Sequence, residues 1–177
     1  MGEAKARREL LKRKMLVELE RLMMPTSPAE DALNDEIRAL NFYSIERLPA
    51  DQLAYMKMQP QQCHQNAGVY ARLDPTGESR HVSGWWKRGG ILFFHSVVLT
   101  QTKLRCITPY PDPSPLEFAP DSHIEWREEN GVMNATRQDH KVPFLIRDFP
   151  DRIIRDATAA RDALAAGADP MSIEVPF

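Results

Sequence analysis

A change of hydrophobic periodicity near Arg80 constrains the fold more than any other feature of this sequence. Before it, stretches rich in good helix formers carry apolar residues three and four positions apart, as in Leu11, Met15, Leu19 and Leu22. After it, short runs of β-branched and aromatic residues alternate with turn residues. This order predicts an α+β fold, with N-terminal helices followed by a mainly antiparallel sheet.

Four helices are predicted before Arg80, over residues 2–24, 27–41, 50–59 and 61–73. Ser27 begins the second helix as its N-cap, with Pro28 at the first helical position and Glu30 completing a capping box. The fourth helix carries Cys63 in its first turn.

The second half of the chain is expected to be mostly β-structure. Three antiparallel strands are predicted over 80–87, 91–100 and 104–110, and a further strand over 123–127. A proline-rich ordered loop follows the third strand, and Asn130-Gly131 forms a turn. A C-terminal helix is expected over 151–166, and Gly167 ends it.

Length and composition are those of one compact domain. The chain has 177 residues, of which 42% are hydrophobic and 27% are charged. We expect an N-terminal amphipathic basic helix over 1–24 and a single α+β domain over 25–177, with its core over 59–128. The formal net charge of −2 gives no chain-wide attraction to nucleic acid or to an anionic membrane, so neither is an expected partner.

The N-terminal helix carries a local excess of positive charge. Six basic and two acidic residues lie within its first 14 positions. We interpret them as the solvated face of a helix whose apolar face packs on the domain or on a second copy of the chain. A homo-oligomer through this helix is therefore one prediction, and contact with phosphate or an acidic partner is the alternative.

No apolar stretch reaches the roughly 20 residues of a membrane helix, and the N-terminus has no secretory signal pattern. We therefore expect a soluble cytoplasmic protein whose two cysteines are free thiols. Side chains of zinc-binding types occur at Cys63, His64, His95 and Cys106. They lack the paired spacing of a zinc site, and no phosphate-binding glycine loop occurs, so no metal or cofactor is predicted.

Cys63 and His95 are the candidate catalytic pair. At a helix start, unpaired N–H groups and the helix dipole favour an anion, so we expect a depressed pKa for the Cys63 thiol. His95 lies in the middle of an apolar strand, where its ring needs a polar partner, and Ser96 points to the opposite face. A thiolate beside an imidazole predicts nucleophilic catalysis.

The register across a tight turn at 101–102 nominates a third group. It places Thr100 opposite Lys103, Val97 opposite Cys106, and His95 opposite Thr108. Thr108 or Cys106 is therefore expected near the imidazole, where it would orient His95, and Asp112 is a further candidate acceptor.

The remaining candidate residues would bind substrate. An oxyanion needs two donors, and the Cys63 backbone N–H supplies one. The second would be a side-chain amide from Gln59, Gln61 or Gln62. Asn66, one helical turn after Cys63, would contact substrate or His95, or cap a loop. Trp85 and Trp86 alternate across a strand, which predicts one in the core and one at a substrate cleft or partner contact.

This order of groups resembles that of papain-like cysteine hydrolases. The resemblance covers residues 59–121 and rests on the motifs QCHQN at 62–66, GW at 84–85, FHSVV at 94–98 and ITP at 107–109. These motifs are similar to those of small uncharacterised bacterial and phage proteins. The resemblance implies a papain-like core, with the Cys63 helix packed on the sheet. In that group an aspartate stands two residues before Thr-Pro, where this sequence has Cys106.

Two functions follow from these residues. The first is thiol hydrolysis of an amide or ester, with Cys63 as nucleophile, His95 as base and Thr108 or a nearby acceptor as orienting group. The second is a non-catalytic binding protein on the same scaffold, phage-encoded and with lost chemistry, which the absent aspartate favours. In that case Cys63 is a small buried hydrophobe on a helical stripe with Ala67.

Overall fold

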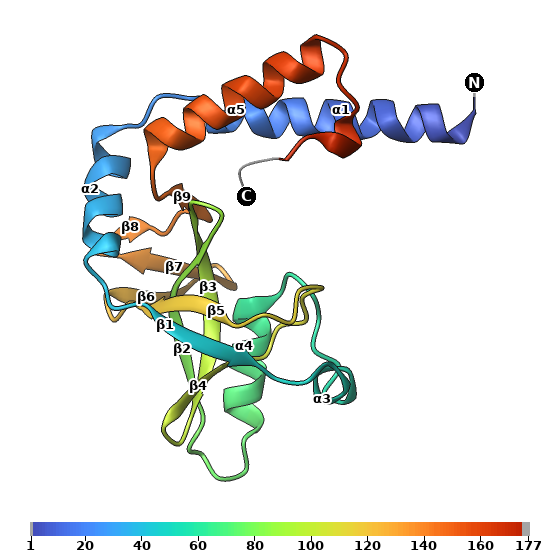
Figure 1. The fold of residues 1–177 in the computed structure, drawn as a ribbon. Coiled ribbons are helices and arrows are strands. Elements are labelled where there is room, and N and C mark those ends of the chain that lie inside the picture. Colours follow the sequence, from blue (N-terminus) through green and yellow to red (C-terminus); the bar gives the residue numbers. More distant parts are fainter. Residues whose placement is uncertain (1, 175–177) are drawn as a thin grey trace. The chain divides into compact units, whose positions relative to one another are not determined.

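The computed structural model describes residues 2–174 (Figure 1). The chain forms two compact units. One contains the residues up to 34, residues 89–91 and the residues from 147 onward, and the other contains residues 35–88 and 92–146. The division of the chain into a helix over 1–24 and a domain over 25–177 stays a prediction. Residues 1 and 175–177 lie outside the described residues.

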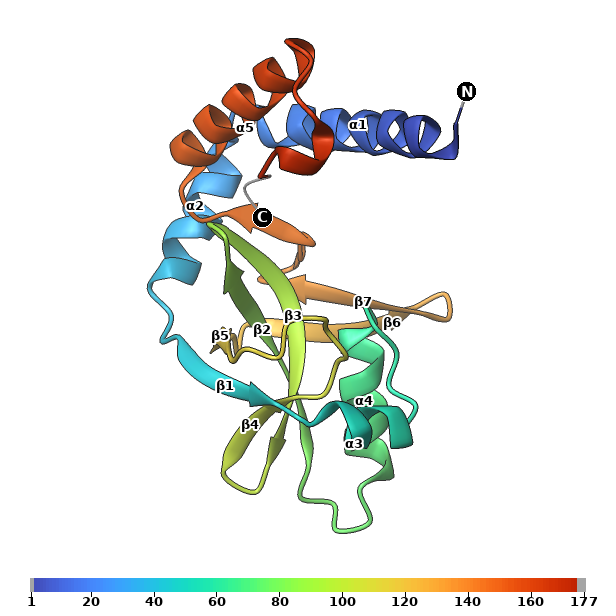
Figure 2. The ribbon, with the colours of Figure 1, turned by 45° about the vertical axis from the view of Figure 1, so that its right-hand side comes forward.

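The first unit is helical. Helix α1 (Glu3–Leu22) lies beside helix α5 (Pro150–Ala165), and a short 3-10 helix, η1 (Pro170–Ser172), also contacts α1 (Figures 1 and 2). The buried side chains of α1 are Met15, Leu19 and Leu22, and those of α5 are Ile153, Ala157, Ala160 and Leu164. Three of the four positions of the apolar stripe predicted for the N-terminal helix are therefore buried, and the fourth, Leu11, is half-buried.

Arg147 joins three segments of this unit. Its buried guanidinium donates to both carboxylate oxygens of Glu30, at 2.9 and 2.8 Å. It also donates to the backbone carbonyl of Leu22, at 2.9 Å, and to that of Met24. The carbonyl groups at a helix C-terminus lack partners within the helix, so Arg147 satisfies the end of α1 while holding the start of α2.

Helix α2 (Pro28–Arg38) begins at the predicted N-cap, because Ser27 Oγ accepts the Glu30 backbone N–H at 3.1 Å. The Glu30 carboxylate pairs with Arg147 and does not complete the predicted capping box. It ends at Arg38 rather than at the predicted residue 41. The chain then forms strand β1 (Tyr43–Arg47), which the sequence did not indicate.

The second unit is built on a six-stranded sheet. Besides β1 it contains β2 (Arg80–Arg88), β3 (Ile91–Thr100), β4 (Lys103–Cys106), β5 (Leu116–Pro120) and β9 (Leu145–Arg147). The strand order is β2-β5-β1-β4-β3-β9, and β2 also pairs with β3. Strand β1 is parallel to β4 and antiparallel to β5, so the sheet is mixed. The pairing of β2 with β3 closes it into a barrel.

The predicted hairpin register is confirmed, since Thr100 pairs with Lys103 and Val98 with Arg105. The third predicted strand stops at Cys106 instead of residue 110. Apolar side chains from five strands fill the barrel. The buried ones are Ile45, Val97, Cys106, Leu116 and Phe118, and the partly buried Val82, Trp86 and Leu104 pack against them.

Two helices cover part of the outer barrel surface: α3 (Ala50–Tyr55) and α4 (Cys63–Leu73) (Figure 2). Leu53 of α3 and Ala67 of α4 form a second buried cluster with Val98 and Ile107. The prediction that the cysteine-bearing helix packs on the sheet is confirmed. The sheet is a closed mixed barrel, and a papain-like core stays a prediction. None of the helices within residues 2–174 is long and apolar enough to cross a membrane.

A smaller sheet contains β6 (Ile124–Glu129), β7 (Val132–Arg137) and β8 (His140–Lys141). The turn predicted at Asn130-Gly131 joins the first two, with positive φ at both residues. Buried Asp121 accepts hydrogen bonds from the Trp85 indole at 3.0 Å and from Arg137 Nε at 2.8 Å. This network fixes the small sheet to barrel strand β2.

Gly84 permits the close approach of β2 to β5. A Cβ at this position would lie 2.0 Å from the backbone oxygen of Ala119. We expect Gly84→Ala to lower the free energy of unfolding by about 1–3 kcal/mol, because backbone atoms must shift to relieve the overlap. The matched control is Gly68→Ala in α4, where a Cβ meets nothing within 4 Å. It should raise stability by up to about 1 kcal/mol. Urea unfolding of both variants tests the pair, and equal stabilities would contradict it.

Candidate functional site

Cys63 is the first residue of α4 and is half-buried. Burial raises the pKa of its thiol above the ordinary value, and hydrogen bonds from the backbone N–H groups of Ser96 and His64 only partly offset this. The expectation of a depressed pKa was therefore wrong, because removal from water outweighs the helix start. Cys63 and Cys106 are both free, as predicted.

His95 lies inside the barrel and is 5% exposed. Its Nε2 atom is 3.4 Å from Cys106 Sγ. Within residues 2–174 this is the only hydrogen bond of the ring, and none joins it to Cys63. Burial lowers the pKa of His95 to about 3, and the positive charge of Arg47 contributes. The imidazole is therefore neutral at neutral pH.

Thr108 is buried but has a different partner from the predicted one. Its hydroxyl accepts a hydrogen bond from Asn66 Nδ2 at 3.3 Å. Asn66 also donates to the Gln59 carbonyl at 2.7 Å and accepts from the Gln59 N–H at 3.1 Å. Asn66 thus holds the loop before α4 against the segment after β4. The group beside His95 is Cys106, the other candidate, while Asp112 is exposed and accepts from the Ser114 N–H at 2.9 Å.

All three candidate glutamines are exposed. The side-chain amide of Gln59 donates to the Lys57 carbonyl at 3.0 Å, so it is already engaged. Gln61 has a positive φ of 63°, and Gln62 is the residue before α4. Gln61 and Gln62 thus flank the N–H groups at the helix start.

The two tryptophans differ in burial, and the predicted substrate cleft or partner contact of one of them stays a prediction. Trp85 is 0% exposed and belongs to the core, whereas Trp86 is half-buried. Its ring centroid lies 5.5 Å from that of His95 and 5.3 Å from that of Tyr110. Trp86 therefore forms part of the surroundings of His95.

Arg47 is a site residue that sequence reasoning missed. Its Nη1 atom donates to Cys106 Sγ at 3.2 Å and to the Thr108 carbonyl at 3.5 Å. The guanidinium carbon lies 5.2 Å from the Trp86 ring centroid and 4.9 Å from that of Tyr110. Arg47 ends strand β1, so no local signal placed it near Cys106.

A second polar cluster that the sequence did not reveal lies on the outer face of β3. Buried Ser96 Oγ is 2.7 Å from His64 Nδ1 and 2.7 Å from His81 Nε2. Ser83 Oγ lies 3.2 Å away and accepts the Trp126 indole N–H at 2.9 Å. Burial lowers the pKa of His64 to about 4, with a further contribution from His81. The predicted outward direction of Ser96 is confirmed.

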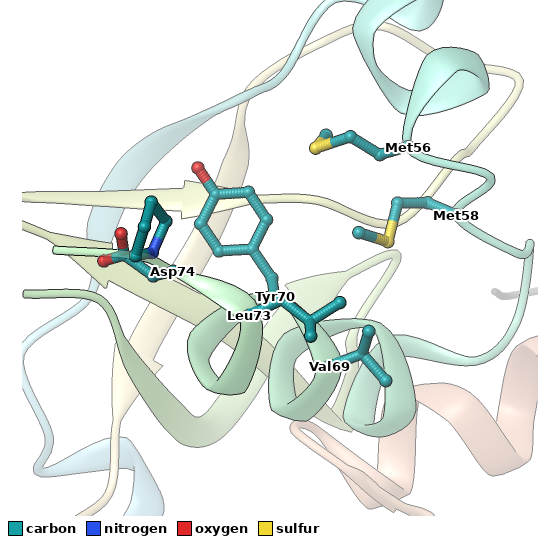
Figure 3. A pocket seen from close by; sticks show the side chains of 7 residues that line it. Met56, Met58, Val69, Tyr70, Leu73 and Asp74 are labelled. Atoms are coloured by element: carbon teal, nitrogen blue, oxygen red, sulfur yellow. The ribbon is translucent and has the colours of Figure 1, made fainter. Parts of the chain in front are cut away.

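A pocket of about 330 Å³ lies at the other end of α4 from Cys63 (Figure 3). Its lining consists of Met56, Met58, Val69, Tyr70, Leu73, Asp74 and Pro75. The pocket is mainly apolar and does not include Cys63 or His95. Within the described part of the chain, no three side chains of metal-ligating types are grouped so as to hold an ion.

Comparisons with protein-family models, with curated proteins and with solved structures found no match to this chain. The function must therefore be argued from the geometry of the site.

Alkylation tests the ionisation of Cys63. Only the thiolate reacts with iodoacetamide, so the labelling rate of Cys63 in the folded protein should follow a pKa above the ordinary thiol value of about 8.5. Peptide mass spectrometry across a pH series measures this separately from buried Cys106. A midpoint at or below the ordinary value would show that the helix start outweighs burial.

The neutral state of His64 predicts a pH-dependent stability. Its pKa is about 4 in the folded protein and about 6.5 when unfolded, so the unfolded chain binds a proton first. Stability should be complete above pH about 6.5 and fall as the pH drops toward about 4. In His64→Gln this slope should be smaller by up to about 1.4 kcal/mol per pH unit.

Urea unfolding across this pH range measures the slope. The control is His140→Gln, which changes an exposed imidazole and should keep the wild-type slope. An unchanged slope in His64→Gln would contradict the assignment.

Proposed function

We propose that the protein is a thiol hydrolase that cleaves an amide or ester bond, with Cys63 as nucleophile and His95 as general base. One observation carries the proposal: Cys63 lies against the backbone N–H of Ser96, the residue directly after a neutral, buried histidine. Within residues 2–174, His95 Nδ1 has no hydrogen-bond partner. A neutral imidazole with one bare nitrogen is able to accept a thiol proton.

The reaction would start from a neutral pair. As Cys63 Sγ attacks the carbonyl carbon, its proton passes to His95 Nδ1, and a tetrahedral intermediate forms. The protonated His95 gives this proton to the amine or alcohol as the bond to it breaks, which leaves a thioester on Cys63. His95 then takes a proton from the water that attacks the thioester and returns it to the Cys63 sulfur as the carboxylic acid leaves. The raised pKa of Cys63 and the lowered pKa of His95 agree with proton transfer during attack rather than with a resting ion pair.

The oxyanion would be held at the start of α4. The Cys63 backbone N–H is one donor. Gln61 and Gln62 are the better candidates for the second, since the Gln59 amide is bound to the Lys57 carbonyl.

A non-catalytic binding protein is the second candidate. The observation in its favour is that His95 hydrogen-bonds to Cys106 while both thiols stay protonated at neutral pH. The papain-like resemblance is compatible with either function, because a scaffold does not determine activity.

Acetylation by p-nitrophenyl acetate tests the proposed function without a known substrate. The wild-type protein should release p-nitrophenolate in a burst and carry one acetyl group on Cys63, seen by intact and peptide mass spectrometry. His95→Asn should slow acetylation about 100-fold or more, because the general base is lost. Cys63→Ala should abolish the burst.

The matched control is His140→Asn, an exposed histidine that should leave the rate unchanged. Acetylation of Cys63 at the same rate in wild type and His95→Asn would refute the pair. No acetylation of the wild type would favour the binding protein.

A further inference from the structure

The sulfur of Cys106 has three polar neighbours inside the barrel. Arg47 Nη1 lies at 3.2 Å, His95 Nε2 at 3.4 Å and the Thr108 carbonyl oxygen at 3.9 Å. The cysteine is 0% exposed, so water does not compete for these contacts. The sulfur has a single hydrogen to donate, so the role of each neighbour as donor or acceptor limits the roles of the other two.

Two of the three neighbours have only one possible role. The Thr108 carbonyl can only accept, and we assign it the single S–H hydrogen of Cys106 beside the hydrogen bond that it accepts from Arg47. The Arg47 guanidinium can only donate, so the sulfur accepts from it. With its one hydrogen used, the sulfur can only accept from His95 as well. The hydrogen of the neutral ring then lies on Nε2, and Nδ1 is bare.

Arg47 makes further contacts in this arrangement. Its guanidinium packs against the rings of Trp86 and Tyr110 and shares the Thr108 carbonyl. Its positive charge beside a buried ring also disfavours protonation of His95, so the ring keeps a single hydrogen.

We propose that Cys106 is a positioning residue that fixes the tautomer of His95, with the hydrogen on Nε2 and the bare Nδ1 available to the Cys63 thiol. This deepens the proposed function and rests on it. A cysteine here takes the orienting role that an acidic side chain fills in other nucleophile, base and orienter sites. Unlike a carboxylate, the thiol adds no negative charge that would draw a proton onto the ring.

The tautomer of His95 is measured directly by ¹⁵N nuclear magnetic resonance of the full chain labelled at histidine. In the wild type, the His95 signals should show a protonated Nε2 and a bare Nδ1 at neutral pH. Cys106→Ala should shift the ring toward the other tautomer or a mixture, because its acceptor is lost. Cys106→Ser should keep the wild-type pattern, since a hydroxyl can also accept.

The control for loss of core volume is Val97→Ala, in the same barrel cluster, which leaves the acceptor in place. It should preserve the wild-type tautomer. A hydrogen on Nδ1 in the wild type, or an unchanged pattern in Cys106→Ala, would overturn the proposal. Should Cys106→Ala fail to fold, the wild-type tautomer and the Cys106→Ser spectrum still decide.

The acetylation assay separates this proposal from the proposed function. Cys106→Ala should slow acetylation of Cys63 about 10-fold or more, because His95 loses the acceptor that holds its tautomer, and Cys106→Ser should recover most of the rate. Wild-type acetylation together with an unaffected Cys106→Ala would refute the positioning role alone. The expected tautomer without any acetylation of the wild type would refute the hydrolase and leave the orienting contact established.

Discussion

The parallel pairing of β1 with β4 places Arg47 opposite Cys106, and the surroundings of His95 depend on this one register. It brings a guanidinium from the first strand of the barrel to a sulfur on the fourth. The same strand closes the barrel by pairing with β5, which removes His95 from water. Strand β1 therefore both closes the barrel and places the positive charge of Arg47, and together the two effects keep the His95 imidazole neutral.

Strand β3 separates two polar groups because alternate side chains point to opposite faces. His95 points into the barrel toward Cys106, and Ser96 points outward to His64 and His81. Cys63 lies at the N–H of Ser96, where the helix start meets this strand. The sulfur of Cys63 and the imidazole of His95 are both uncharged before the reaction. The proposed chemistry therefore depends on proton transfer during attack rather than on a thiolate–imidazolium pair formed beforehand.

Local signals predicted much of the fold. Strand β3 has the predicted bounds, the N-cap at Ser27 starts α2, and the turn before Lys103 sets the hairpin register. Strands β1 and β5 were missed because they pair only with segments distant in sequence, and β5 follows a proline-rich stretch. The sequence offered two candidate partners for His95, Thr108 and Cys106. The strand register does not distinguish them, because they lie two residues apart on the same face.

The sequence by itself determined the α+β class, the position of Cys63 at a helix start and the face of β3 that carries His95, because helix caps and strand alternation are local properties of a few neighbouring residues. Tertiary structure alone decided the barrel closure, the role of Arg47 and the protonation of Cys63 and His95. These depend on desolvation and on charges brought together from distant segments, and neither quantity can be derived from residues adjacent in the chain.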